Sequence, residues 1–213
     1  MIIGVDEAGI GTLAGPMVIA AVGFNDVYKI PEGVRDSKKM TAEQREVMVE
    51  KIYLACCWKS IHFGSHARID EVGNIWDVWT EIMKQVAAEI TKLCPSMWNV
   101  VTQKMTTQPI ATVDGNRLVP GADCFKYVVK ADETIPEVSA ASIVAKYCQT
   151  SVMEALHEQY PQYGFSKHNG YPTADHKKAL TEFGPSPVHR RCYAPVKKEL
   201  ERRSSEVKDQ KGK

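Results

Sequence analysis

The sequence predicts a mixed α/β fold, and three observations support that prediction. Short apolar runs typical of buried strands open the chain, a long amphipathic helical pattern follows, and helical patterns dominate the C-terminal third. The length of 213 residues suits one domain, and 44% hydrophobic with 25% charged residues is typical of a globular protein. The sequence contains no apolar run of the about 20 residues that span a bilayer. A membrane span and a disordered chain are therefore excluded.

The N-terminal elements are predicted from apolar runs and one capping signal. Residues 2–5 and 17–24 have the composition of buried strands. The glycine-rich segment 9–15 between them is short enough to make the two strands antiparallel neighbours. A capping box that begins at Thr41 predicts a helix over about 42–55.

The later elements follow from helical spacing, β-rich composition and stop signals. In chain order we expect a strand over 58–63, a long amphipathic helix over 75–93 ended by Pro95, strands over 110–113 and 125–129, a helix over 139–160, a loop over 160–171 and a helix between Thr173 and Gly184. Both tryptophans of the long helix, Trp76 and Trp79, are interpreted as core residues. The charged tail 197–213 is expected to be partly disordered.

The net charge does not decide whether the protein binds nucleic acid, and the cysteine pattern argues only against zinc-binding and disulfide-rich proteins. A net charge of +1 gives no overall electrostatic argument for or against nucleic acid, so any such argument depends on local patches. The six cysteines lack CxxC spacing, which argues against a zinc site or a disulfide framework and favours reduced thiols. Because no basic segment followed by an apolar one opens the chain, we expect a cytoplasmic protein, and a monomer by default.

Acidic residues stand at the ends of three predicted strands. Asp6 and Glu7 end the first strand, and Asp114 and Asp132 follow two later ones. Taken alone, the first pair is equally well explained by a turn or by surface acids, but a sheet can bring Asp6, Glu7 and Asp114 together. Oxygen ligands of this kind suit Mg²⁺ or Mn²⁺, whereas zinc favours His or Cys. The pattern therefore predicts a divalent-metal site for phosphoryl transfer.

Seven sequence blocks resemble the motifs of one nuclease family, in that family's order. The blocks lie at residues 6–16 (DEAGIGTLAGP), 36–40 (DSKKM), 113–116 (VDGN), 136–146 (PEVSAASIVAK), 160–165 (YPQYGF), 168–173 (HNGYPT) and 189–191 (HRR). The chain is thus similar to the type 2 ribonucleases H, the family of bacterial ribonuclease HII, from residue 2 to about residue 196. A resemblance over nearly the whole chain makes chance a poor explanation.

The resemblance implies a ribonuclease H-like fold, in which helices flank a mixed central sheet, with a catalytic domain over 1–196 and a C-terminal helical extension. It implies an endonuclease that cuts the RNA strand of RNA–DNA hybrids. The same enzyme is expected to cut 5′ of ribonucleotides embedded in duplex DNA, leaving 5′-phosphate and 3′-hydroxyl ends. By this resemblance Asp6, Glu7 and Asp114 are catalytic and hold Mn²⁺ or Mg²⁺, which agrees with the chemistry of carboxylates.

The resemblance also implies residues that contact the nucleic acid. Gly9, Ile10 and Gly11 match a segment that reads the ribose 2′-hydroxyl, and Tyr171 matches a tyrosine that stacks on the following deoxyribose. Basic residues in or beside the matched blocks are expected to contact phosphates: Lys38, Lys39, Lys146, Lys167, Arg190 and Arg191. The histidines His168 and His189 are either proton shuttles or, as is commoner, packing residues.

Two positions depart from the family pattern. The family places a fourth catalytic aspartate four residues after the lysine of its SAASIxAK block; Thr150 stands there and is not expected to replace it. Ile10 stands where the family has arginine, and Asp132 matches a neighbouring position rather than the fourth ligand. An alternative therefore stays open, in which the chain is a catalytically impaired relative that binds hybrid or junction nucleic acid. A different nuclease or resolvase on the same fold is a third possibility.

Overall fold

The computed structural model describes residues 1–93, 98–99, 104–105 and 110–211. The strands are β1 (Ile2–Ala8), β2 (Met17–Phe24), β3 (Trp58–Gly64), β4 (Trp98–Asn99), β5 (Lys104–Met105), β6 (Ala111–Asp114) and β7 (Phe125–Val128). The α-helices are α1 (Ala42–Ala55), α2 (His66–Val72), α3 (Ile75–Leu93), α4 (Ala131–Thr134), α5 (Pro136–Gln159), α6 (Phe165–His168), α7 (Ala174–Phe183) and α8 (Ala194–Lys211). Short 3₁₀ turns are η1 (Val27–Lys29), η2 (Ser37–Lys39) and η4 (Pro161–Tyr163).

The chain divides into two compact units. Unit 1 comprises residues 1–8, 18–62 and 79–147, and unit 2 comprises residues 9–17, 63–78 and 148–213. Each unit is described by itself.

Unit 1 is built on a five-stranded mixed sheet with the strand order β3-β2-β1-β6-β7. Strands β1 and β2 pair antiparallel along their whole length, from Ile2 opposite Phe24 to Ala8 opposite Val18. Strands β1, β6 and β7 run parallel to one another. The carboxyl ends of β1 and β6 therefore meet at the same edge of the sheet.

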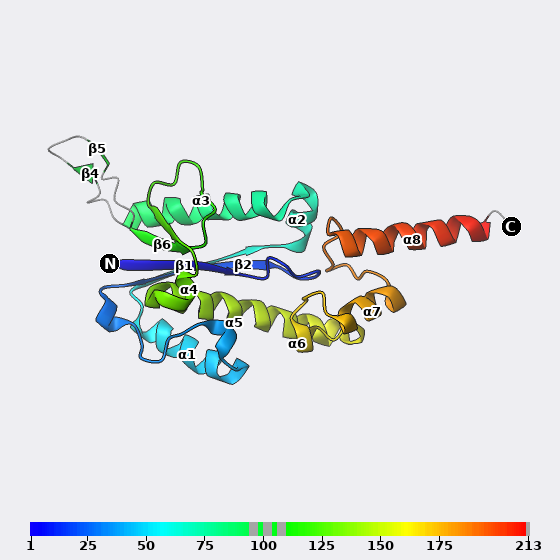
Figure 1. The fold of residues 1–213 in the computed structure, drawn as a ribbon, viewed down its shortest axis with the longest axis horizontal. Coiled ribbons are helices and arrows are strands. Elements are labelled where there is room, and N and C mark those ends of the chain that lie inside the picture. The colour runs from blue at the N-terminus through cyan, green and yellow to red at the C-terminus, as the bar shows by residue number, and fades with distance from the viewer. Residues whose placement is uncertain (94–97, 100–103, 106–109, 212–213) are drawn as a thin grey trace. The chain divides into compact units, whose positions relative to one another are not determined.

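Helices cover both faces of this sheet, which explains why every residue of β2 is buried. Figure 1 shows α3 along one face, and α1 with the first part of α5 along the other. The start of α5 packs directly on β1, because a Cβ atom at Gly4 would lie 2.1 Å from the carbonyl oxygen of Glu137. Only glycine allows so close an approach, which brings α5 next to the strand that carries Asp6.

Unit 2 packs the glycine-rich segment 9–17 among helices. One buried cluster joins Ala14 to residues of α5, η4, α6 and α7, including Met153 and Phe165. A second cluster contains Leu13, Leu180 of α7 and Val196 of α8. The segment that follows β1 is therefore a fixed part of the core of unit 2.

The observed elements confirm the predicted mixed α/β fold. The capping box at Thr41 is present, with both of its hydrogen bonds, and Thr173 caps α7 as expected. The predicted stop at Pro95 lies outside the described residues. Among those described, no helix is both long and apolar enough to cross a membrane.

Three parts of the chain differ from the expectation. Helix α2 was not predicted, because Ile69 is its single buried residue and gives no periodic pattern. The expected loop over 160–171 contains η4 and the short helix α6. The tail, expected to begin as a helix and to be partly disordered towards its end, is helical as far as Lys211.

Candidate active site

Two aspartates lie at the same edge of the sheet in unit 1. Val5 of β1 is the register partner of Val113 of β6, so Asp6 and Asp114 are the next residues on neighbouring parallel strands. Such strands lie about 4.8 Å apart, and residues in register project to the same face. The sequence prediction that a sheet brings these two strand ends together is confirmed at the level of the backbone.

Asp6 is held on the face of the sheet that α5 covers. Its residue is only 5% exposed. Burial raises the pKa of the Asp6 carboxyl well above its ordinary value, and the neighbouring charges of Glu7 and Asp114 raise it further. A hydrogen bond with the Ser142 side chain on α5 acts in the opposite direction. Asp6 is therefore a buried acid whose hydrogen bonds do not offset the cost of burying its negative charge.

Glu7 points to the opposite face, because successive side chains of a strand alternate. There the indole Nε1 of Trp79, on α3, donates a hydrogen bond of 3.2 Å to Glu7 Oε2. Burial raises the pKa of Glu7 to about 7, while the Trp79 hydrogen bond lowers it. Trp79 is 2% exposed, so it is the core residue that the sequence predicts, but it is also a partner of a candidate ligand. A buried indole N–H needs a hydrogen-bond acceptor, so the predicted burial of Trp79 indicates that it has a polar partner but does not identify that partner as Glu7.

Asp114 and Asp132 lie near enough to the end of β1 for their charges to act on its two acids: the charge of Asp114 acts on Asp6, and the charges of both aspartates act on Glu7. Asp114 Oδ1 accepts a 2.7 Å hydrogen bond from the backbone N–H of Ala131, the first residue of α4. Asp132, also in α4, is 3% exposed and accepts a 2.9 Å hydrogen bond from Lys38 Nζ. The charges of both aspartates raise the pKa of Glu7. We call Asp6, Glu7, Asp114 and Asp132 the carboxylate group.

The carboxylate group fits a hard divalent cation in its chemistry. All its side chains offer oxygen donors, and two of them are buried acids whose pKa is raised by burial and by like charge. A cation would relieve both effects. In the part of the chain that the structure describes, no three His, Cys, Asp or Glu side chains are already arranged to hold a metal ion.

The predicted lysines differ in their surroundings. Lys38 lies with the carboxylate group through its ion pair with Asp132. Lys39 is mostly exposed and lies 3.7 Å from Asp36. Burial, and secondarily the charge of Arg45, lowers the pKa of Lys146 to about 8. The structure therefore brings Lys38 to the candidate ligands through its ion pair with Asp132.

Thr150 lies in the half of α5 that belongs to unit 2. Its Oγ1 is buried, and no described residue forms a hydrogen bond with it. The interpretation of this position as that of the fourth ligand remains a prediction. Asp132 is the residue that sequence reasoning undervalued, because its link to Lys38 spans 94 positions and leaves no local pattern.

In unit 2, a buried guanidinium organises the loop that follows β1. Arg190 is fully buried and donates to the carbonyl oxygens of Gly9 (2.7 Å), Ile10 (2.9 Å) and Gly15 (3.0 Å). Tyr193 donates a further hydrogen bond of 2.6 Å to the Ile10 carbonyl. The expectation that Arg190 contacts phosphates is therefore corrected, since its donors face loop carbonyls instead of solvent.

Tyr171 lies beside this loop within the same unit. A Cβ atom at Gly11 would lie 3.9 Å from Tyr171 Cε1, and the Tyr171 residue is 39% exposed. The backbone N–H of Leu13 donates to the Gly170 carbonyl at 2.8 Å, which ties the two segments together. The structure thus brings together Gly9, Ile10, Gly11 and Tyr171, the residues that the family resemblance implies as readers of the ribose.

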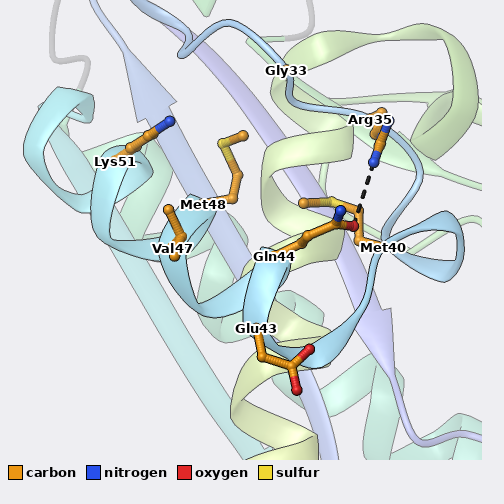
Figure 2. Close-up of a pocket in the computed structure, with 8 residues that line it drawn as sticks. All are labelled: Gly33, Arg35, Met40, Glu43, Gln44, Val47, Met48 and Lys51. Atoms are coloured by element: carbon orange, nitrogen blue, oxygen red, sulfur yellow. Dashed lines mark hydrogen bonds between the residues drawn. The ribbon is translucent and has the colours of Figure 1, made fainter.

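A surface hollow of about 440 Å³ lies elsewhere in unit 1, between the segment that precedes η2 and helix α1. Figure 2 shows Met40, Val47 and Met48 as its apolar lining, and the hydrogen bond from Arg35 to Gln44. Neither the carboxylate group nor any predicted substrate contact lines it. The hollow therefore plays no part in the site.

Comparisons with known proteins show the family to which the chain belongs. The family model of ribonuclease HII matches residues 3–196. The chain is 37% identical over 199 residues to the ribonuclease HII of Cupriavidus pinatubonensis, covering 93% of this chain and 86% of that protein.

Solved structures agree as well. The chain is similar to the RNase HII in the complex with PCNA from Archaeoglobus fulgidus, with a TM-score of 0.71 and 28% identity, covering 90% of this chain and 93% of that one. The structure of Bst-RNase HIII in complex with Mn²⁺, at 20% identity and a TM-score of 0.62, covers 93% of this chain and 68% of that one and supports the fold alone. The chain belongs to the ribonuclease HII family.

Proposed function

We propose that the protein is an endonuclease that cuts the RNA strand of RNA–DNA hybrids and cuts 5′ of ribonucleotides embedded in duplex DNA. The observation that carries this proposal is the carboxylate group at the shared edge of β1 and β6, in a member of the ribonuclease HII family. We further propose that it acts as a monomer in the cytoplasm.

We propose that Asp6, Glu7, Asp114 and Asp132 hold Mg²⁺ or Mn²⁺. Bound there, the metal supplies an activated water and neutralises the charge of the leaving 3′-oxygen. The protein's own residues orient the ligands: Trp79 fixes Glu7, the Ala131 amide fixes Asp114, and Lys38 fixes Asp132. Such outer partners determine how well carboxylates bind a metal.

In the proposed function, unit 2 supplies the discrimination between RNA and DNA. Arg190 and Tyr193 donate hydrogen bonds to the carbonyl oxygens of Gly9 and Ile10. These bonds fix the backbone of the loop through its carbonyl groups. Tyr171 adds an exposed ring beside Gly11. A 2′-hydroxyl is the feature that such contacts can recognise. The Ile10 side chain has no hydrogen-bond donor, so in this proposal the backbone of the loop and Tyr171 perform the recognition.

The direct test is cleavage of a DNA duplex that contains one ribonucleotide, with separate titrations of Mg²⁺ and Mn²⁺ and mapping of the products. We expect metal-dependent cutting on the 5′ side of the ribonucleotide and no cutting of an all-DNA duplex. Binding without cutting by either metal would replace this proposal with that of a catalytically impaired, nucleic-acid-binding relative. Efficient cutting of the all-DNA duplex would favour a different nuclease.

The role of Asp132 separates two accounts of the fourth carboxylate. We expect Asp132→Asn to lower the cleavage rate about 10- to 100-fold and to raise the metal concentration required, since it removes a negative charge from the group. Thr150→Asp, measured in parallel, is expected to change little. The opposite pattern, with a normal Asp132→Asn and an activated Thr150→Asp, would place the fourth ligand at position 150.

A further inference from the structure

A chain of buried hydrogen bonds runs through two histidines to the backbone of Tyr171, all within unit 2. The backbone N–H of Ser186 lies 3.0 Å from His189 Nδ1, and Ser186 Oγ lies 2.8 Å from the same atom. His189 Nε2 lies 3.1 Å from His176 Nε2, and His176 Nδ1 lies 2.9 Å from the carbonyl oxygen of Tyr171. Both histidines have no exposed surface. We call Ser186, His189, His176 and Tyr171 the histidine relay.

The groups at the two ends of the relay determine which nitrogen of each histidine ring carries the proton. The Ser186 backbone N–H can only donate, so His189 Nδ1 accepts and the neutral ring carries its proton on Nε2. The Tyr171 carbonyl can only accept, so His176 carries its proton on Nδ1. The contact between the rings is therefore a hydrogen bond from His189 Nε2–H to His176 Nε2. Every donor in the chain meets an acceptor in this single arrangement.

The surroundings keep the relay neutral. Burial is the main reason why the pKa of His176 is lowered to about 4 and that of His189 to about 3; the charge of His176 contributes to the lowering at His189, and that of His168 contributes at both. The His168 ring stacks on His176 with centroids 4.5 Å apart. An added proton would place two N–H groups opposite each other, either at Ser186 or between the rings. The relay therefore has a fixed direction at neutral pH.

The relay closes a ring of contacts around the predicted ribose readers. His189 forms a β-bridge with Ala14, and the Arg190 N–H donates to the Leu13 carbonyl at 2.8 Å. On the other side, the Leu13 N–H donates to the carbonyl of Gly170, which precedes Tyr171. The backbone of Tyr171 is thus tied to the loop that contains Gly11 both directly and through the two rings.

We propose that His189 and His176 are positioning residues for Tyr171, which hold its backbone so that the ring stays beside Gly11 for contact with the ribose. This inference rests on the proposed function for its effect on cleavage. It also assigns a role to His189, which sequence reasoning left between a proton shuttle and a packing residue. The relay makes His189 a donor to His176 and leaves it no part in the chemical step.

The kinetic test compares His176→Phe, which keeps the ring volume without a donor, with His176→Asn, whose amide can still donate to the Tyr171 carbonyl. For the duplex with one ribonucleotide we expect His176→Phe to raise KM about tenfold while kcat changes little, as for the loss of one positioning hydrogen bond. His176→Asn should restore most of this loss. His157→Phe is the matched control, because no described residue forms a hydrogen bond with His157 Nδ1.

A double-mutant cycle separates positioning from a purely structural role. In a Tyr171→Ala background, His176→Phe should raise KM no further, because the residue that it positions is already absent. Equal and additive losses in both backgrounds would overturn the proposal. So would an unchanged KM in a folded His176→Phe protein, or a loss that His176→Asn fails to restore.

A spectroscopic test does not depend on activity. Long-range ¹H–¹⁵N spectra of the histidine rings should show the Nδ1–H tautomer for His176 and the Nε2–H tautomer for His189, and the Tyr171 resonances should shift in His176→Phe. The reverse tautomers, or an unshifted Tyr171, would overturn the relay. If the wild-type protein shows these tautomers but cleaves no ribonucleotide substrate, the proposed function fails while the positioning of Tyr171 stands.

Discussion

Asp6→Asn is expected to lower the rate of cleavage by at least about a thousandfold and, in the same protein, to raise the melting temperature. The loss of rate follows from removing one charged ligand of the carboxylate group. The gain in stability follows because Asp6 is 5% exposed and its ionised form is disfavoured by burial and by the charges of Glu7 and Asp114. Asparagine keeps the size of the side chain and its ability to bond to Ser142 while it removes the charge.

The stability gain should depend on pH in a defined direction. Folding raises the pKa of Asp6, so the protonated carboxyl is favoured in the native state and its stabilising contribution is lost as the pH rises through the native pKa. Asp6→Asn should therefore differ little from wild type near pH 4 and be more stable at pH 8, by roughly 1–2 kcal/mol or about 2–8 °C. Thermal unfolding in the presence of a chelator measures this difference.

The control for this prediction is Asp70→Asn in unit 2. Asp70 is also partly buried, and its Oδ1 accepts a 2.9 Å hydrogen bond from the Cys192 N–H. Asparagine removes the negative charge of Asp70 but keeps an amide oxygen that can accept this bond, so Asp70→Asn should change the melting temperature and the turnover little. An Asp6→Asn protein that is folded and cleaves at the wild-type rate would exclude Asp6 from the reaction.

Local sequence signals predicted most of the fold. The capping box at Thr41 and the stop at Gly184 depend on residues within one turn of each other, so the helices they bound could be located from the sequence. Apolar runs located β1 and β2, and the short segment between them gave their antiparallel pairing. The parallel pairing of β1 with β6 joins residues more than 100 positions apart, and only the resemblance implied a mixed sheet.

The site was predictable where its chemistry lies at strand ends, and unpredictable where distant segments meet. Asp6, Glu7 and Asp114 were found because each ends an apolar run. Two contacts of the site join residues far apart in the sequence: Lys38 with Asp132, and Trp79 with Glu7. They form when distant segments pack together, so no regular spacing in the sequence predicts them. These contacts require the assembled unit 1.

Arg190 is a charged residue whose burial could not be predicted from the sequence. Arginine is almost never fully buried unless its donors are satisfied, so sequence alone favours a surface position beside Arg191. In the structure three loop carbonyls and the Tyr193 hydroxyl surround its guanidinium. The residue that was expected to bind phosphate instead fixes the loop predicted to read the ribose.

Arg190→Met is expected to lower the free energy of unfolding by about 3–5 kcal/mol, because the buried carbonyl of Gly15 loses its guanidinium donor and that of Gly9 keeps only the bond from Thr12 Oγ1. In a chain of this size such a loss corresponds to roughly 6–20 °C in melting temperature. The Ile10 carbonyl keeps its bond from Tyr193 and the Gly9 carbonyl keeps its bond from Thr12, so the loop should loosen at Gly15 first. Chemical denaturation and a thermal scan measure both quantities.

Two further variants show whether the stability depends on the planar set of guanidinium donors of Arg190 or only on its positive charge. Arg190→Lys keeps the charge, but one ammonium lacks the planar fork that reaches the carbonyls of Gly9, Ile10 and Gly15, so it should recover only part of the lost stability. Arg191→Met removes an equal charge from an exposed neighbour and should leave the melting temperature within about a degree, as for other surface substitutions. If Arg190→Met folds as stably as wild type and only weakens binding to nucleic acid in a salt-dependent way, then Arg190 contacts phosphate after all. A large loss of stability that Arg190→Lys only partly restores assigns it to the loop.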